Sequence, residues 1–152
     1  MRYTRRKGWQ ASKKDVWSLN DTLDPIIAAG LRKFLETDFR ACPGSLLTKS
    51  MVGHTDAEIE EGIQLWRDKL KQMLYAFEAE EPDCNDYDFE SYWVDPTGRA
   101  TDIFDIEANT PYSIEHTNHD VYLKYRNDGE QHELKCKQGR ELFAKHYGDL
   151  WV

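Results

Sequence analysis

Two histidines three residues apart are the first side chains in this sequence that could do chemistry. His116 and His119 lie in the run Glu-His-Thr-Asn-His-Asp at 115–120, with a carboxylate on each side. Zinc accepts imidazole and carboxylate ligands, so a metal-assisted hydrolase is one interpretation of this run. The usual companions are missing, because the chain has no His-Glu-x-x-His and no Cys-x-x-Cys motif. We therefore predict a polar surface loop without a metal, and keep the two histidines as alternative metal candidates.

Carboxylates that could serve acid–base catalysis occur at 102–107. General acid–base work needs two such groups with separated pKa values, but a segment this rich in acids contains a suitable pair by chance. The chain has neither a Gly-x-Gly-x-x-Gly nor a Gly-x-x-x-x-Gly-Lys-[Ser/Thr] motif. We therefore predict no cofactor, and favour a binding protein over an enzyme.

Charge is distributed unevenly along the 152 residues, whose formal net charge is −8. Residues 78–107 contain many acids and a single base, Arg99. Closely spaced carboxylates can imitate the phosphate backbone of nucleic acid and occupy a basic groove on a partner. Ordinary solvation of the segment is the alternative. The predicted acidic binding surface consists of Asp83, Asp86, Asp88, Glu90, Asp102 and Asp105.

Residues 1–14 form a basic, aromatic arm with six bases and no acid. Cations interleaved with rings suit phosphate contact with base stacking, or cation–π contact. Docking of the arm on the protein's own acidic segment is the alternative, and packing in the core is the alternative for the tryptophans. The acidic balance of the whole chain argues against nucleic acid as the general partner. A small nucleotide would be held by Arg5, Arg6, Lys7, Trp9 and Trp17.

The elements that position these residues are mainly helical. Thr-Asp-Ala-Glu at 55–58 is a capping box, and apolar residues follow it at steps of three and four as far as Phe77. This spacing predicts a helix with Trp66 in the core. The same spacing runs over residues 16–35, where Pro25 predicts either a bend or two separate helices.

Residues 82–129 differ in composition, since they are rich in Asp, Asn, Tyr and Phe. Residues 92–94 and 121–125 have the aromatic and β-branched content of strands, so a small β-hairpin and a long ordered loop are both compatible with this insertion. Asn-Asp-Gly at 127–129 is a turn signal, after which a helical spacing returns.

These observations predict one mainly α domain, a compact bundle of three main helices with an acidic aromatic insertion. The predicted parts are a basic arm (1–14), a helical part (15–79), the acidic insertion (82–129) and a C-terminal helix (130–152).

Three widely spaced cysteines, Cys42, Cys84 and Cys136, suit reduced thiols better than a disulfide framework. No apolar run is long enough for a membrane span, and no signal peptide follows the basic start. We therefore expect a cytoplasmic protein.

Both ends of the chain combine aromatic, apolar and charged residues in a defined order. Residues 7–17 approximate Arg-Gly-aromatic-Ser-x-x-Asp-x-Trp, with Lys7 in the place of the arginine and Trp9 one residue further from Ser12. Residues 142–151 read Leu-Phe-x-Lys-x-Tyr-x-x-Leu-Trp. The two patterns resemble the opening and the ending of a group of small bacteriophage accessory proteins. The resemblance implies a phage protein that acts in the host cytoplasm, and it implies no particular activity.

Small non-structural phage proteins often act by binding. The resemblance therefore implies a protein that inhibits or sequesters a host or defence component, in which case the partner of the acidic surface is a host or defence protein with a basic surface. A nucleotide-binding sponge that uses the basic arm, a metal-assisted hydrolase and a virion component are the alternatives.

Overall fold

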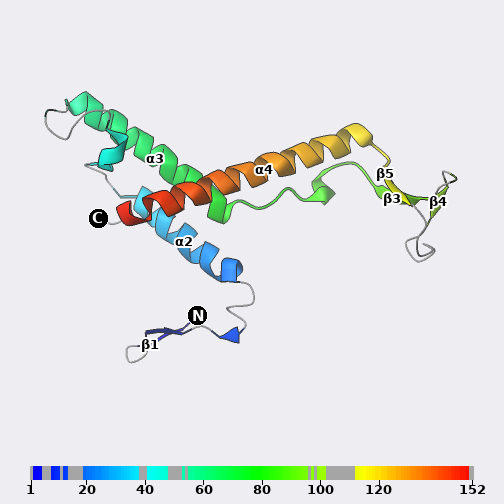
Figure 1. Ribbon diagram of the computed structural model, residues 1–152, viewed down its shortest axis with the longest axis horizontal. Coiled ribbons are helices and arrows are strands. Elements are labelled where there is room, and N and C mark those ends of the chain that lie inside the picture. Colours follow the sequence, from blue (N-terminus) through cyan, green and yellow to red (C-terminus); the bar gives the residue numbers. More distant parts are fainter. Residues whose placement is uncertain are drawn as a thin grey trace. The chain divides into compact units, whose positions relative to one another are not determined.

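The chain folds into two compact units. The computed structural model describes residues 2–4, 8–10, 12–13, 19–37, 41–47, 53, 55–95, 97, 99–101 and 112–150. Unit 1 comprises Met1–Ala79 and Leu134–Val152, and unit 2 comprises Glu80–Glu133. Figure 1 shows their helices and strands, among which helix α4 (His119–His146) contributes residues to both units.

Helix α2 (Leu19–Leu35) continues through Pro25 as one helix. Proline has no N–H, so one bond to the carbonyl four residues earlier is missing. Packing of the residues that follow Pro25 offsets this loss, because Ala28 and Leu31 are both buried. Arg32 also forms a 2.6 Å ion pair with Glu78 of helix α3 (Asp56–Glu78). The prediction of a helix is confirmed from residue 19 onward, while 15–18 lie outside the described residues.

Helix α3 (Asp56–Glu78) begins at the predicted capping box. The Thr55 hydroxyl accepts a 3.3 Å bond from Glu58 N, and the Glu58 carboxylate accepts a 2.9 Å bond from Thr55 N. Two backbone donors at the start of the helix are thereby satisfied. Both the helix and its starting residue are as predicted.

Unit 1 has its core on the inner face of α3, where Trp66, Leu70 and Met73 are almost completely inaccessible to solvent. Leu31 of α2 completes this buried cluster. Phe77 of α3 meets Phe143 of α4 edge-on, with ring centroids 5.0 Å apart. Three packed helices therefore form the body of the protein, and the predicted mainly α fold with Trp66 in the core is confirmed. Other apolar residues packed on the cluster are Ile27, Phe34, Leu35, Cys42, Leu46, Leu74, Leu142 and Leu150.

Gly139 allows the backbones of α3 and α4 to approach closely. A Cβ atom at this position would lie 2.4 Å from the carbonyl oxygen of Gln72 and 2.6 Å from Cβ of Ala76. Glycine in a helix costs about 1 kcal/mol relative to alanine. Glycine is nevertheless needed at position 139, because the packing of α3 against α4 leaves no room for a Cβ atom.

Helix α4 (His119–His146) begins eleven residues before the predicted start of the C-terminal helix, and ends before residue 152. The boundaries 130–152 were therefore wrong, and so was the interpretation of 121–125 as a strand. Asn118 precedes the helix, and its carbonyl accepts a 3.0 Å bond from Tyr122 N. The Asn-Asp-Gly run at 127–129 lies inside the helix and forms no turn.

One local contact and two contacts with a residue distant in the sequence support α4 through this run. Arg126 and Glu130, one turn apart, form a 2.9 Å ion pair across it. Tyr122 and Tyr125, which also suit a strand, lie three residues apart and share one helical face, where both rings contact Phe89. The aromatic content that predicts a strand serves a helix surface instead.

The acidic insertion contains a three-stranded antiparallel sheet of order β4-β3-β5. Strand β3 (Ser91–Val94) pairs with β4 (Ala100–Thr101) and β5 (Ser113–His116), with Trp93 opposite Ile114. A small hairpin, one of the two structures compatible with the sequence, is present as β3–β4.

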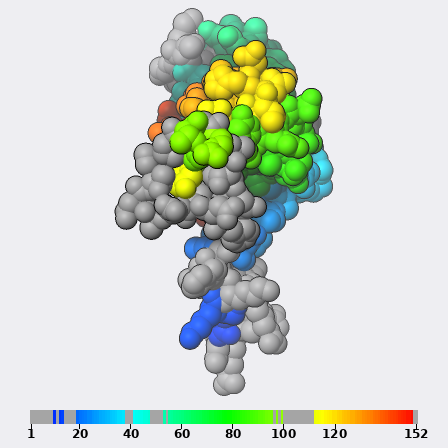
Figure 2. Space-filling view, turned by 90° about the vertical axis from the view of Figure 1, so that its right-hand side faces the viewer, coloured from blue at the N-terminus to red at the C-terminus, as the bar shows by residue number. Residues whose placement is uncertain are grey.

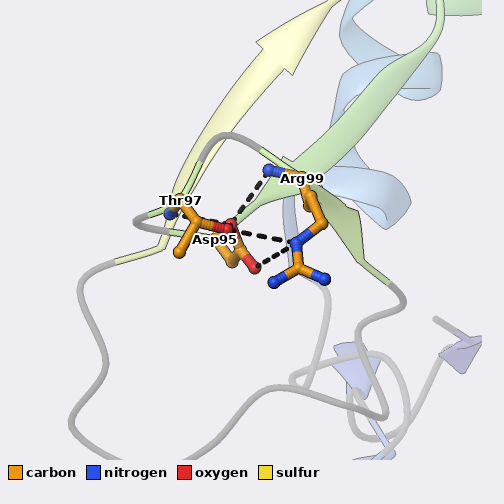
Figure 3. Close-up of polar contacts among 3 residues, drawn as sticks. All are labelled: Asp95, Thr97 and Arg99. Carbon is orange, nitrogen blue, oxygen red and sulfur yellow. Dashed lines mark hydrogen bonds and ion pairs between the residues drawn. The ribbon is translucent and has the colours of Figure 1, made fainter.

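Asp95 organises the turn between β3 and β4 (Figure 3). Its Oδ1 accepts bonds of 2.8 and 2.7 Å from the backbone N and the hydroxyl of Thr97, and a 2.9 Å bond from Arg99 N. The Asp95 amide donates to the Arg99 carbonyl at 2.9 Å. These donors stabilise the carboxylate, so the pKa of Asp95 lies below its ordinary value, with the Thr97 hydroxyl as the largest cause.

Two short strands pair in the basic arm, which the sequence analysis did not predict. They are β1 (Arg2–Thr4) and β2 (Gly8–Gln10), in antiparallel register. The three cysteines are free thiols, and burial raises the pKa of Cys42. In the described part of the chain, no helix has both the length and the apolar character that crossing a membrane requires.

Candidate functional site

The acidic segment, residues 80–90, begins unit 2. Over its last five residues, Asp-Tyr-Asp-Phe-Glu, exposed and half-buried side chains alternate. Asp86, Asp88 and Glu90 are exposed, whereas Tyr87 and Phe89 are half-buried. The backbone is a turn and a bend here, since Asp86 ends a 3₁₀ turn and Phe89 N donates to the Tyr87 carbonyl at 3.0 Å. The three carboxylates of this stretch therefore face solvent, while its two rings are partly covered.

Hydrogen bonds fix the backbone that carries these carboxylates. Glu90 N donates to the Thr117 hydroxyl at 2.9 Å, and Thr117 N donates to the Glu90 carbonyl at 3.0 Å. The Tyr87 hydroxyl donates to Asp128 of α4 at 2.8 Å. Both ends of the Tyr87–Glu90 stretch are thus attached to residues that follow much later in the chain.

A 3₁₀ turn, η2 (Cys84–Asp86), orders the start of the segment. The Asp83 carboxylate accepts bonds of 2.9 and 2.7 Å from the backbone and side-chain nitrogens of Asn85. These bonds lower the pKa of Asp83, with the backbone bond as the largest cause. Asp83 therefore carries its negative charge throughout the neutral range.

The half-buried rings pack in an aromatic cluster with α4. Phe89 lies 5.5 Å from the rings of both Tyr122 and Tyr125, and Tyr87 lies 5.2 Å from Tyr125. Tilted and edge-to-face contacts of this kind are favourable for aromatic pairs. In Figure 2, green atoms of the acidic segment reach the surface beside yellow atoms from the start of α4.

A pocket of about 570 Å³ opens between the acidic segment and the first turns of α4. Rings, carboxylates and hydroxyls share its surface, and none of its described lining residues is basic. Aromatic faces and carboxylates both attract cations. The lining consists of Cys84, Asn85, Tyr87, Asp88, Phe89, Glu90, Ser91, Thr117, Tyr122 and Tyr125.

Charge over the whole of unit 2 has the same sign as the segment. Its 54 residues contain fifteen carboxylates and three Lys or Arg side chains, a formal charge of −12, which leaves +4 for unit 1. The carboxylates of residues 80–90 form no ion pair with any base among the residues that the structure describes. The field of this net charge repels anions and attracts cations.

The predicted acidic surface is described in part. Asp83, Asp86, Asp88 and Glu90 are all exposed, and the last two line the pocket. Asp102 and Asp105 lie outside the described residues.

The predicted basic–aromatic site lies almost entirely outside the described residues, which include only the backbone of Trp9, in β2. The undescribed members are Arg5, Arg6, Lys7 and Trp17.

The two histidines that were kept as alternative metal candidates make other contacts. His116 Nδ1 lies 2.9 Å from the Ser91 hydroxyl, and its ring stacks on Tyr122 with centroids 3.4 Å apart. His119 is exposed and begins α4. In the part of the chain that the structure describes, no three metal-ligating side chains gather in one place.

Sequence reasoning missed the aromatic wall that α4 contributes. The signal was present, because Tyr122 and Tyr125 are three residues apart, as are Tyr122 and His119. The interpretation of residues 121–125 as a strand concealed this helical spacing. Thr117 carries no local signal, since its partner Glu90 is 27 residues earlier.

A second pocket, of about 480 Å³, lies in unit 1 between α3 and α4. It is lined by Lys71, Gln72, Tyr75, Lys135 and Gln138, with the Lys135 ammonium 5.8 Å from the centre of the Tyr75 ring. Its two lysines are opposite in charge to the carboxylates beside the aromatic cluster. No family model, curated protein or solved structure matches this chain.

Proposed function

We propose that this protein is a phage accessory binding protein that acts in the host cytoplasm and inhibits or sequesters a host or defence protein. The acidic segment would occupy a basic groove on that partner, in the place of a phosphate backbone. The observation that carries the proposal is the alternation over residues 86–90, which directs three carboxylates to solvent from an anchored backbone.

Anchoring supports binding because a rigid acidic face loses little conformational freedom on association. Asp86, Asp88 and Glu90 place three exposed carboxylates within five residues, and the remaining acids of unit 2 add to their charge. Closely spaced negative charges of this kind resemble the charge of a phosphate backbone.

The net charge of unit 2 favours fast, salt-sensitive association. A large field of one sign steers an oppositely charged partner toward the site and raises the association rate. Such steering is screened at distances beyond about 8 Å at physiological ionic strength. Binding that depends on the acidic segment should therefore weaken as salt is added.

Affinity capture from bacterial lysate with three forms of the tagged protein tests the proposal. The first is the wild type, and the second replaces Asp86→Asn, Asp88→Asn and Glu90→Gln. The third is a control with the same change in charge, in which Glu60, Glu61 and Glu141, all exposed in unit 1, become glutamine.

We expect the wild type and the control to retain one stoichiometric protein with a basic surface. The acidic-segment variant should bind the same purified protein roughly tenfold or more weakly. Equal affinity of the acidic-segment variant and the wild type for that partner would contradict the proposal.

A further inference from the structure

We propose that the pocket beside the acidic segment receives an arginine side chain of the basic partner. The inference rests on the proposed function and adds a specific anchor to it. Its starting point is the pocket of about 570 Å³ in unit 2, a volume within the usual range for ligand sites.

The walls of this pocket favour a flat cation. Phe89 and Tyr125 are inclined at 40° with centroids 5.5 Å apart, and Tyr122 meets Phe89 at 71°. Half-buried rings in several orientations offer more than one aromatic face or edge to an entering group. A guanidinium group is planar and weakly hydrated, so it stacks on such rings more readily than an ammonium group does.

Carboxylates complete the match. Asp88 and Glu90 are lining residues, and both are exposed. Arginine presents a fork of N–H donors that can bond a carboxylate through two parallel contacts while its plane stays on a ring. Lysine has a compact, strongly hydrated charge and gains less from this arrangement.

Hydroxyl groups of the lining can accept bonds from the remaining donors. Ser91 and Thr117 both line the pocket, and the backbone of Glu90 is held by Thr117. A cation entering this pocket displaces no basic group, because none of the ten lining residues is lysine or arginine. Charge complementarity therefore commits the site to a cationic segment of a protein.

Titration of the full-length ¹⁵N-labelled protein with two capped peptides tests the inference. The probes are acetyl-Gly-Arg-Arg-Gly-amide and acetyl-Gly-Lys-Lys-Gly-amide, which carry the same charge. We expect the arginine peptide to move the amide resonances of residues 84–91, Tyr122 and Tyr125. It should bind roughly two- to fivefold more tightly than the lysine peptide, the range of an exposed cation–π contact.

Two variants separate the ring contribution from the charge. Phe89→Leu keeps an apolar side chain and removes the ring, so the arginine peptide should fall to the affinity of the lysine peptide. Asp88→Asn with Glu90→Gln should weaken both peptides alike. The spectrum of each free variant reports whether unit 2 retains its fold.

Equal affinities of the two peptides in the wild type, unchanged by Phe89→Leu, would overturn the arginine anchor and leave attraction by charge alone. Absence of any shift with either peptide would overturn it as well. The proposed function is decided separately, because capture of the whole partner depends on the acidic surface and not on one pocket.

Discussion

The Tyr87 hydroxyl donates a 2.8 Å hydrogen bond to Asp128 Oδ2, 41 residues later on α4. Its ring also lies edge-on to Tyr125, with centroids 5.2 Å apart. Asp86 and Asp88 flank Tyr87 in the sequence, so this one side chain fixes the position of two exposed carboxylates. The carboxylate of Asp128 holds the phenolic proton and raises the pKa of Tyr87, so the bond is intact at neutral pH.

Tyr87→Phe should loosen the acidic segment without disturbing the helices of unit 1. The substitution keeps the ring contacts and removes the only bond between the Tyr87 side chain and Asp128. Amide hydrogens of residues 84–90 should then exchange roughly two- to tenfold faster, because local opening becomes easier. Amides of α3 belong to unit 1 and serve as the internal control. Unchanged exchange at 84–90 would show that the rings alone hold the segment.

The Asp95 turn should weaken in acid. The folded pKa of Asp95 lies below the unfolded value, because Thr97 and Arg99 donate to its carboxylate. Ionised Asp95 therefore stabilises the turn above about pH 4, and this stabilisation is lost as pH falls through the folded pKa. The amide proton shifts of Thr97 and Arg99, followed by NMR between about pH 6 and pH 2, should show that step.

Asp95→Asn is the matched control for this titration. Asparagine keeps an Oδ1 acceptor for the same donors but does not ionise in this range. The acid step at Thr97 and Arg99 should be absent in the variant while the turn persists. A step of the same size in the variant would assign the titration to another group.

Gly139→Ala and Gly30→Ala should change stability in opposite directions. A Cβ at Gly139 would overlap Gln72 O and Ala76 Cβ, whereas a Cβ at Gly30 of α2 meets nothing within 4 Å. We expect Gly139→Ala to lower the free energy of unfolding by about 1–3 kcal/mol, the usual cost of overpacking. Gly30→Ala should raise it by about 0.5–1 kcal/mol, since alanine favours the helix. Thermal or urea unfolding measures both, and a stabilising Gly139→Ala would contradict the close approach of the two helices.

Local signals predicted the helices α2 and α3 of unit 1 well and unit 2 poorly, for a physical reason. The capping box at Thr55 and the spacing up to Phe77 involve residues within one or two turns of each other, so the sequence contains the whole argument for α3. In unit 2, the residues at 121–125 suit a strand by composition. Their helical state depends on Phe89, more than thirty residues earlier.

The candidate site divides in the same way. Exposure of Asp83, Asp86, Asp88 and Glu90 follows from charge and was predictable. The pocket was not, because it requires α4 to extend back to His119 and Thr117 to bond Glu90. Strand β5 escaped prediction since its residues are mostly exposed and show no alternation of apolar and polar side chains.

The run Asn127-Asp128-Gly129 offers a direct test of that continuous helix. A Cβ at Gly129 meets nothing within 4 Å, and the residue lies in the middle of α4. Gly129→Ala should therefore stabilise the protein by about 1 kcal/mol and slow amide exchange over residues 122–133. A turn at this run would place glycine in the left-handed region, where alanine costs energy, so the same variant would then unfold at lower urea concentration. The sign of the change in urea midpoint therefore distinguishes the helix from the turn. It also tests the aromatic wall of the pocket, because Tyr122 and Tyr125 line the pocket from this helix.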